Sequence, residues 1–207
     1  MNHRAHPLTA DHITELPAGC QTCVFWELPN APRGPQPDER DSVGEAKQLW
    51  VRAMELDWGA PGIVLRDHDD TVGYATFLPA EQAHRTRRLG ATPSDDALVL
   101  ATLWVAPDER GTGIATALLH RVLKQAHDAG LRAVEATGAR GEAAPCLMPE
   151  GFLLASGFVV HHQHPRFPLL RLDLRQTVRW QEAMEHALEG VRAALSRRDR
   201  RTVPTTS

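Results

Sequence analysis

Apolar residues follow one another almost without interruption from Leu98 to Val105, and a helical pattern comes soon after them. A run of this length, rich in branched side chains, predicts a strand that is covered on both faces of a sheet. After a break at Pro107, apolar residues recur every three or four positions from Ile114 to Ala126, which predicts a helix. Gly130 is a typical helix terminator. A strand, a turn and a helix therefore form the predicted centre of the chain.

Shorter apolar runs along the rest of the chain predict the other strands of a sheet. Two of them, 63–66 and 72–78, flank an acidic turn and predict a hairpin. The others lie at 22–28, 131–137, 158–162 and 169–174. Helical spacing predicts a helix from Ser42, a residue that caps helices well, to about Asp57, and a short one at 152–156. The pattern predicts a mixed α/β fold with a central sheet of about six to seven strands and helices on both faces.

The sequence divides into a central domain and two flanking segments. Residues 1–19 are polar with two prolines and predict an irregular lead-in, and the prolines of 30–41 predict an exposed loop. Residues 20–175 carry all the predicted strands. In residues 176–207, apolar positions at helical spacing precede a polar end, which predicts an extra amphipathic C-terminal helix and a disordered tail. The apolar face of this helix is expected to pack on the domain or, alternatively, on the second subunit of a homodimer.

The turn between the central strand and helix reads Arg110-Gly111-Thr112-Gly113. Such a turn directs several backbone N–H groups and the positive end of the helix dipole at one point, which suits an anionic oxygen such as phosphate. Glycine leaves room for the anion to reach the amides, and it tolerates a positive φ. The turn lacks the Lys-Ser/Thr pair of a Walker loop and the third glycine of a dinucleotide fingerprint. It therefore predicts a phosphate site of another kind.

The sequence Arg110-Gly111-Thr112-Gly113-Ile114-Ala115 resembles the acetyl-CoA-binding signature of the GNAT superfamily of N-acetyltransferases, Arg/Gln-x-x-Gly-x-Gly/Ala. It follows Leu103-Trp104-Val105-Ala106-Pro107, which resembles the hydrophobic-x-Val-x-Pro of the same family. The order of predicted elements is similar over roughly residues 20 to 175. The resemblance implies a GNAT-like acyltransferase domain over these residues, with a fourth and a fifth strand that splay apart.

The resemblance also implies which residues hold acetyl-CoA, the expected cosubstrate. The pantetheine arm is expected in the gap between the fourth and fifth strands, against Leu103, Trp104 and Val105. An amide near Val105 is expected to polarise the thioester carbonyl. No metal is expected. The pyrophosphate is expected on the backbone amides of Arg110, Gly111, Thr112, Gly113, Ile114 and Ala115.

An acceptor amine must lose a proton before it attacks, because an amine of pKa about 10.4 is almost fully protonated at neutral pH. Glu135, inside a predicted strand beside the gap, is the first candidate for the base, since partial burial makes a carboxylate a better base. The alternative for Glu135 is a structural ion pair with Arg132 or Arg140. Asp95 and Asp96 are second candidates, with a turn and a cap as their alternative.

Many GNAT enzymes use a tyrosine to protonate the departing thiolate, in a pattern like Asn-x-x-Ala-x-x-Leu-Tyr-x-x-x-Gly-Phe. Aligned on Gly157-Phe158, this chain has Leu153 in place of the tyrosine and Cys146 in place of the asparagine. The thiolate, with a pKa of about 8.5, needs little help. Water, Ser156 and Cys146 remain as candidates for the acid, and filling a pocket is the alternative for Cys146. Tyr74, the one tyrosine of the chain, is expected to serve packing.

Composition excludes some partners and raises one metal question. A net charge of −3 gives no reason to expect nucleic acid, and no stretch predicts a membrane span or a signal peptide. Three cysteines among 207 residues indicate a reducing compartment, so a cytoplasmic protein is expected. The basic residues 84–88 are expected in solvent, with phosphates or an acidic acceptor as the alternative. A zinc site could in principle form from Cys20, Cys23, Cys146 and His161–His164, but free thiols without a metal are favoured.

Together these features predict an N-acetyltransferase that moves an acetyl or short acyl group from acetyl-CoA to an amine by direct attack in a ternary complex. A small-molecule or peptide amine is the expected acceptor, and its identity is set in variable loops. The alternative is a protein of another class, an acyl-CoA-binding sensor or interaction module that has the cofactor site but does not catalyse acyl transfer. The missing tyrosine favours that alternative, and thiol release with a panel of amines separates the two.

Overall fold

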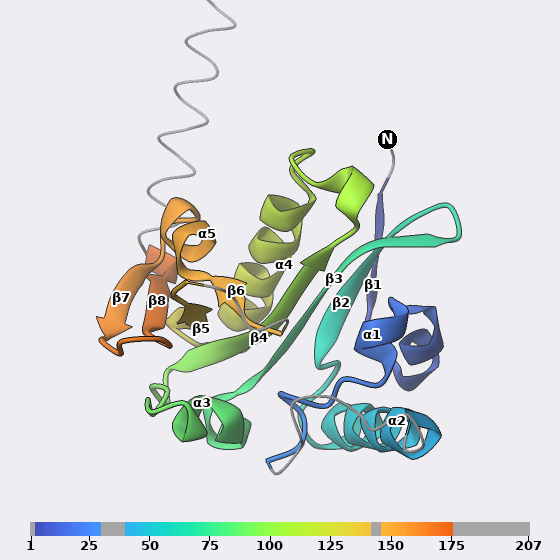
Figure 1. The fold of residues 1–207 in the computed structure, drawn as a ribbon, viewed down its shortest axis with the longest axis horizontal. Helices are drawn as coiled ribbons and strands as arrows, with labels where there is room; N and C mark the ends of the chain where they lie inside the picture. Colours follow the sequence, from blue (N-terminus) through green and yellow to red (C-terminus); the bar gives the residue numbers. More distant parts are fainter. Residues whose placement is uncertain (1–2, 30–39, 142–145, 176–207) are drawn as a thin grey trace, which may run out of the picture.

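The computed structural model describes residues 3–29, 40–141 and 146–175, which form a sheet with helices on both of its faces (Figure 1). The strands are β1 Arg4–Pro7, β2 Gly62–Asp67, β3 Asp70–Pro79, β4 Ala97–Val105, β5 Ala133–Ala139, β6 Met148–Pro149, β7 Val159–His162 and β8 Leu169–Asp173. The α-helices are α1 Ala18–Gln21, α2 Arg40–Asp57, α3 His84–Arg88, α4 Ile114–Asp128 and α5 Glu150–Ala155. The 3-10 helices are η1 Ala10–Glu15, η2 Ala80–Gln82 and η3 Pro107–Glu109.

The sheet has eight strands in the described part of the chain. Seven follow the order β1-β2-β3-β4-β5-β8-β7, and β6 pairs with β5 outside this row. The β4–β5 and β5–β6 pairs are parallel, and the other pairs are antiparallel. This arrangement confirms the predicted mixed α/β class, with one strand more than the upper end of the predicted range. No helix of the described residues has an apolar stretch long enough to cross a bilayer.

The strands β4 and β5 pair over only part of their length. Their parallel pairing ends where Leu100 lies opposite Ala136, although both strands continue beyond that point. Directly after Leu100, the register of β4 with β3 skips Ala101. A bulge of this kind bends the strand that carries it. The splay implied by the family resemblance is therefore present, and β5 pairs with β6 further on.

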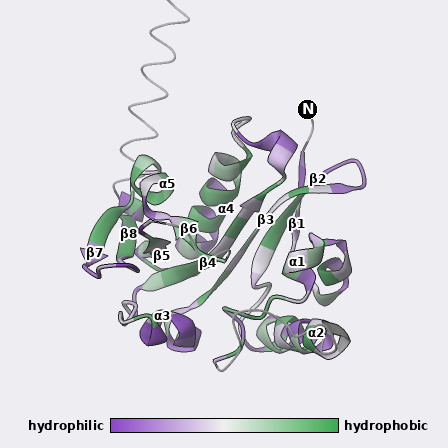
Figure 2. Ribbon diagram, viewed as in Figure 1, coloured by the Kyte–Doolittle hydropathy of each residue, from purple (hydrophilic) through white to green (hydrophobic). Residues whose placement is uncertain are grey.

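Successive side chains of β4 point into two different apolar layers. Leu98 and Leu100 pack with α4 on one face of the sheet. Val99 and Ala101 point to the other face, where Met54 of α2 joins the cluster. Figure 1 shows α4 and α2 on opposite sides of the strands. In Figure 2 the first half of β4 is coloured as hydrophobic, whereas the short α3 is coloured as hydrophilic. Both faces of β4 are covered along its first half, as its continuous apolar run predicted.

Residues 3–19 do not form the irregular lead-in that the composition of 1–19 predicted. β1 adds an edge strand beside β2, and η1 and α1 follow it along the chain. Leu8, Ile13 and Leu16 are almost fully buried with residues of α2 and the sheet. Main-chain pairing at a sheet edge depends on a partner strand far away in the sequence, and local composition does not record that partner.

The strand predicted at 22–28 does not form, because this segment is a series of turns after α1. Side chains of other elements hold its main chain in place of a neighbouring strand. Lys47 donates to the carbonyl oxygen of Cys23 at 2.8 Å, and Arg85 donates to that of Phe25 at 2.7 Å. The apolar run thus predicted the burial of this segment correctly and its secondary structure wrongly.

The remaining predicted elements agree with the structure more closely. α2 begins at Arg40, ahead of the predicted cap at Ser42, and ends at Asp57 as expected. The hairpin, the three strands predicted after α4 and the short α5 agree within two residues at each end. The two-residue β6 and the short α3 were not predicted, since neither is long enough to show a period. Residues 30–39 of the proline-rich loop, and the C-terminal helix and tail predicted for 176–207, lie outside the described residues.

Helix α4 packs tightly on strand β3 at Gly73. A Cβ on this residue would lie 2.8 Å from Cγ2 of Ile114 and 3.2 Å from the carbonyl oxygen of Trp104. Both distances are shorter than ordinary contacts between unbonded atoms. The absence of a side chain at Gly73 therefore sets how the first turn of α4 sits on the sheet.

We expect the substitution Gly73→Val to lower the free energy of unfolding by about 1–3 kcal/mol, because its side chain overpacks the junction of β3 and α4. Urea denaturation followed by circular dichroism measures the change. The matched control is Gly151→Ala in α5, where a Cβ meets no atom within 4 Å and the helix favours alanine. The control is expected to be at least as stable as the wild type, and an equally stable Gly73→Val would contradict the close packing.

Candidate active site

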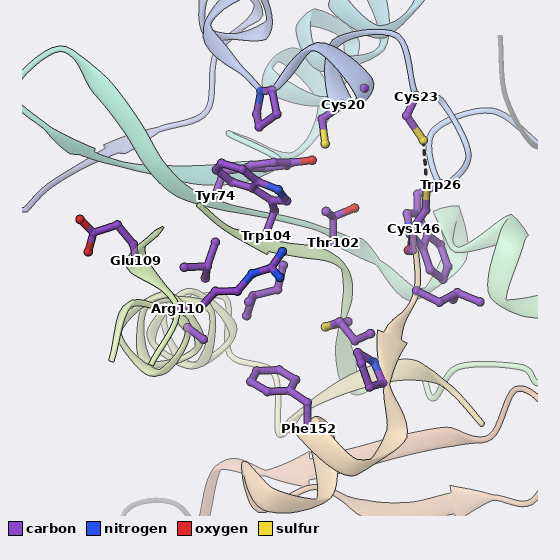
Figure 3. A pocket seen from close by; sticks show the side chains of 18 of the residues that line it. Cys20, Cys23, Trp26, Tyr74, Thr102, Trp104, Glu109, Arg110, Cys146 and Phe152 are labelled. Atoms are coloured by element: carbon purple, nitrogen blue, oxygen red, sulfur yellow. Dashed lines mark hydrogen bonds between the residues drawn. The ribbon is translucent and has the colours of Figure 1, made fainter. Parts of the chain in front are cut away.

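A cavity of about 960 Å³ opens beside β4, beyond the point where this strand leaves β5 (Figure 3). Its outer half is lined by the end of β4, the turn before α4 and the first residues of α4. Its inner half is lined by polar residues of the N-terminal segment, Lys47 of α2 and the residues that lead into β6. Figure 3 shows the Arg110 side chain between Trp104 and Phe152, in the middle of the space. A cavity of this size can hold a substantial ligand.

The turn that begins α4 has a backbone that only glycine adopts readily. Gly111 and Gly113 have φ values of 80° and 96°. These angles lie in the left-handed region, where a Cβ costs conformational energy. A Cβ on either residue would meet no atom within 4 Å, so the angles rather than crowding within the protein require glycine. Because Gly113 is the N-cap of α4, the first amides of this helix lack intrahelical acceptors beside the cavity.

The last residues of β4 form the wall next to this turn. Leu103, Trp104 and Val105 line the cavity, and they pair with β3 along their other edge. Because β5 has diverged, the main-chain groups of β4 that point away from β3 have no neighbouring strand here within the described part of the chain. A strand edge of this kind can accept an extended ligand through main-chain hydrogen bonds. The ring of Trp104 packs on that of Tyr74, with the two centroids 6.0 Å apart.

A buried ion pair stands in the inner half of the cavity. The Nζ atom of Lys47 lies 3.0 Å from Oε1 of Glu27, with the two side chains 4% and 3% exposed. Lys47 also donates to the carbonyl oxygens of Cys20 and Cys23, each at 2.8 Å. Burial acts to lower the pKa of Lys47, but the adjacent Glu27 carboxylate outweighs it, so this pKa is raised. The ammonium therefore stays charged, and the pair adds no net charge to the wall.

Three thiols line the same half of the cavity, and two of them are in contact. The Sγ atoms of Cys23 and Cys146 lie 3.0 Å apart (Figure 3). The hydrogen bond from Cys146 lowers the pKa of Cys23 to about 6, against the opposing effect of burial. The same contact raises the pKa of Cys146, while burial raises that of Cys20. Of the two thiols that share this hydrogen bond, Cys23 is therefore the more acidic.

Most residues that the sequence assigned to the cofactor come together at this cavity. Thr112 and Ile114 do not line it. The Thr112 hydroxyl donates to the carbonyl oxygen of Glu109 at 2.7 Å, and the side chain of Ile114 is buried in the apolar core. The backbone of Thr112 still belongs to the glycine turn, and Ile114 is the first residue of α4. The assigned residues that line the cavity are Leu103, Trp104, Val105, Arg110, Gly111, Gly113 and Ala115.

Glu135, the sequence candidate for the base, lies outside the residues that line the cavity. Its side chain is fully buried. The carboxylate accepts hydrogen bonds from the backbone N–H and the hydroxyl of Ser94, at 3.0 and 2.6 Å, and from Arg171 at 3.1 Å. Arg171 also binds Asp96, at 2.9 Å, and holds the pKa of that carboxyl below its usual value. Glu135 thus has an arginine partner, although not one of the two that the sequence suggested.

The two candidates for the acid differ in position. Cys146 lines the cavity, and its pKa is raised. Ser156 does not line it, and its hydroxyl donates to the carbonyl oxygen of Phe152 at 2.8 Å. Tyr74, which the sequence assigned to packing, is 2% exposed and also lines the cavity. Burial raises its pKa well above the ordinary value, so its hydroxyl stays protonated.

The basic and histidine clusters serve the fold in the described part of the chain. Arg85 donates to Phe25 and lies over its ring at 4.4 Å, and Arg88 donates to the carbonyl oxygen of Pro29. The Nδ1 atom of His164 accepts the backbone N–H of Phe167 at 2.8 Å. Among the described residues, no three His, Cys, Asp or Glu side chains are placed to share a metal ion.

Sequence reasoning missed the Glu27–Lys47 pair, although a signal for it was present. Lys47 precedes Val51 by four positions and Met54 by seven, which places it on the buried face of α2. Glu27 ends an apolar run. A lysine on a buried helical face requires an acidic partner, because an unpaired buried charge is strongly unfavourable.

Comparison with known proteins agrees with this architecture. PaiA N-acetyltransferase from Thermoplasma acidophilum, solved with coenzyme A, superposes with a TM-score of 0.54 at 11% identity, over 84% of this chain and 99% of its own. YncA from Salmonella typhimurium, solved with acetyl-CoA, gives 0.55 at 16% identity, over 83% and 94%. An N-acetyltransferase from Staphylococcus aureus gives 0.52 at 19% identity, over 84% and 99%. At these identities the likeness shows a shared fold.

Sequence comparison gives the family. No curated protein matches the chain. A model of the acetyltransferase (GNAT) family matches residues 23–144, which is more than half of the chain and includes β4, the glycine turn and α4. The chain therefore belongs to the GNAT family of acetyltransferases.

Proposed function

We propose that this acetyltransferase moves an acetyl or short acyl group from acetyl-CoA to an amine, which is a small molecule or a peptide. One observation carries the proposal: the glycine turn and the free edge of β4 line the same cavity. An anion-binding turn beside a strand edge suits a ligand with a diphosphate at one end and an amide-bearing arm at the other. Coenzyme A and acetyl-CoA are present in the PaiA and YncA structures, which share this fold.

The residues present fit this cosubstrate. Arg110 and the amides from Gly111 to Ala115 would hold the diphosphate, since the first amides of a helix lack other acceptors. The edge from Leu103 to Val105 would hold the pantetheine arm and direct it toward the inner half. When bound, acetyl-CoA supplies an activated thioester. Its acyl end would then lie near the polar residues of the inner half, which is where we propose that the amine acceptor binds.

For removal of the acceptor proton we propose Glu27 in preference to Glu135. Both carboxylates have hydrogen-bond partners, but only Glu27 lines the cavity, whereas Glu135 lies outside it. A base has to reach the proton that it removes, directly or through one water. For the departing thiolate, we propose Cys146 rather than Ser156 as a hydrogen-bond donor, because Cys146 lines the cavity; its S–H would exchange the bond to Cys23 for one to the departing thiolate.

The function is tested by measuring coenzyme A binding in calorimetry and thiol release with a panel of amines. The wild type is expected to bind coenzyme A and to release thiol with at least one amine. The substitution Arg110→Ala is expected to weaken binding about ten- to a hundredfold, because a charged hydrogen bond to phosphate is worth about 1.5–3 kcal/mol.

The matched control for that measurement is Arg121→Ala, which removes an exposed guanidinium of α4 that does not line the cavity. It is expected to bind coenzyme A as the wild type does. Binding without thiol release for any amine would assign the chain to acyl-CoA-binding modules instead. An absence of binding would refute the cofactor site itself.

The role of Glu27 is tested by comparing Glu27→Gln with Glu135→Gln at saturating acetyl-CoA. Glu27→Gln is expected to lower the rate about 10²-fold or more and to change its pH dependence, as the loss of a general base does. Because Glu27→Gln leaves the buried Lys47 unpaired, the double variant Glu27→Gln/Lys47→Met provides a second measurement without that charge. If Glu135→Gln were slow while Glu27→Gln stayed fast, the role of base would return to Glu135.

A further inference from the structure

We propose that Cys23 and Cys146 form a reversible disulfide in the wall of the cavity. The two residues are 123 positions apart in the sequence, yet their Sγ atoms lie 3.0 Å from each other. A disulfide has an S–S distance of about 2.05 Å, so the atoms would have to move together by about 1 Å. A small change in the side-chain torsions of the two cysteines would bring the sulfur atoms to bonding distance.

The main chain of both cysteines is held in place beside this contact. The indole N–H of Trp26 donates to the carbonyl oxygen of Cys146 at 2.8 Å. Lys47, which is itself fixed by Glu27, donates to the carbonyl oxygen of Cys23 at 2.8 Å. The first bond joins the segments that carry the two cysteines, and the second fixes the Cys23 segment to α2. They keep the thiols facing each other and reduce the conformational freedom that would be lost on forming the bond.

The chemistry requires an oxidant, and a low-molecular-weight disulfide such as glutathione disulfide supplies it. The Cys23 thiolate attacks one sulfur of this disulfide, and one glutathione thiolate leaves. Cys146, after losing its proton to solvent, attacks the Cys23 sulfur of the mixed disulfide, and the second glutathione leaves. The two cysteines are oxidised, and one glutathione disulfide is reduced to two thiols. The low pKa of Cys23, about 6, provides the thiolate that begins the exchange at neutral pH.

The bond would join two walls of the inner half of the cavity. Cys23 belongs to the turn segment that also carries Glu27, and Cys146 leads into β6. Oxidation would remove the S–H donor of Cys146 and the charge of the Cys23 thiolate from the space proposed for the acyl group. Any effect of these losses on acetyl transfer rests on the proposed function, whereas formation of the disulfide depends on the two thiols alone.

The experiment treats the reduced full-length protein with glutathione disulfide at neutral pH and maps its cysteines by peptide mass spectrometry after alkylation. We expect an intramolecular peptide pair that links Cys23 to Cys146, a loss of two hydrogen atoms in the intact mass, and full reversal by dithiothreitol. Free alkylation of Cys23 and Cys146 after this treatment would overturn the proposal. A link that involves Cys20, or a link only between molecules, would also overturn it.

Two serine variants sharpen the measurement. Cys20→Ser removes the third thiol of the cavity and is expected to form the same linked pair as the wild type. Cys23→Ser is expected to lose the intramolecular link. Because the wild-type peptide map is decisive by itself, a variant that fails to fold leaves the test intact. Since the readout is a covalent link rather than turnover, a failure of the proposed acetyl transfer would be recognised separately.

The same pair predicts a difference in reactivity with pH. Alkylation of Cys23 by iodoacetamide is expected to rise as the pH increases through about 6, because the thiolate reacts and the thiol does not. Cys20, whose pKa burial raises, is expected to react only at clearly higher pH. Quantitative peptide mass spectrometry at a series of pH values measures both residues in one sample. Equal pH dependence of Cys20 and Cys23 would contradict the hydrogen bond between Cys23 and Cys146.

Discussion

The candidate site depends on the interruption of main-chain pairing between β4 and β5. If the two strands stayed paired beyond Leu100, the main-chain groups at this edge of β4 would be hydrogen-bonded to β5, and no cavity would open there. The skipped residue Ala101 bends β4 at this point, and the bent strand runs directly into the glycine turn. Because only residues 106–109 separate the end of β4 from Arg110, the strand edge and the helix amides lie side by side. The chain connectivity therefore fixes the spacing of the two groups that would hold one elongated ligand.

Two buried carboxylates stabilise different parts of this arrangement. Glu135 lies opposite Val99 on β4 and opposite Arg171 on β8, so its hydrogen bonds hold the strands together where they are still paired. Glu27 and its partner Lys47 fix a segment that belongs to no strand. Both carboxylates are buried, but only Glu27 is in the cavity wall. What a buried charge contributes is decided by the partners around it rather than by its burial alone.

The central unit of the fold could be predicted from the sequence, because its signals are local. The apolar run of β4, the positive-φ glycines and the period of α4 are each contained within a few residues. The inner half of the cavity could not be predicted in this way, since it combines Cys20 to Glu27 with Lys47 and with Cys146. No local pattern records that these three parts of the chain meet. For the same reason the strand β1 could not be predicted, because its pairing with β2 is long-range.

The segment predicted wrongly as a strand shows why its real conformation matters for the site. In a strand, side chains alternate between the two faces, so only every second residue would reach the cavity. In the turns that form instead, Cys23, Trp26 and Glu27 all line it. Lys47 and Arg85 bind the carbonyl oxygens that a strand ladder would otherwise satisfy. Side-chain hydrogen bonds thus replace a neighbouring strand, and this replacement lets consecutive turns present a thiol, an indole and a carboxylate to one space.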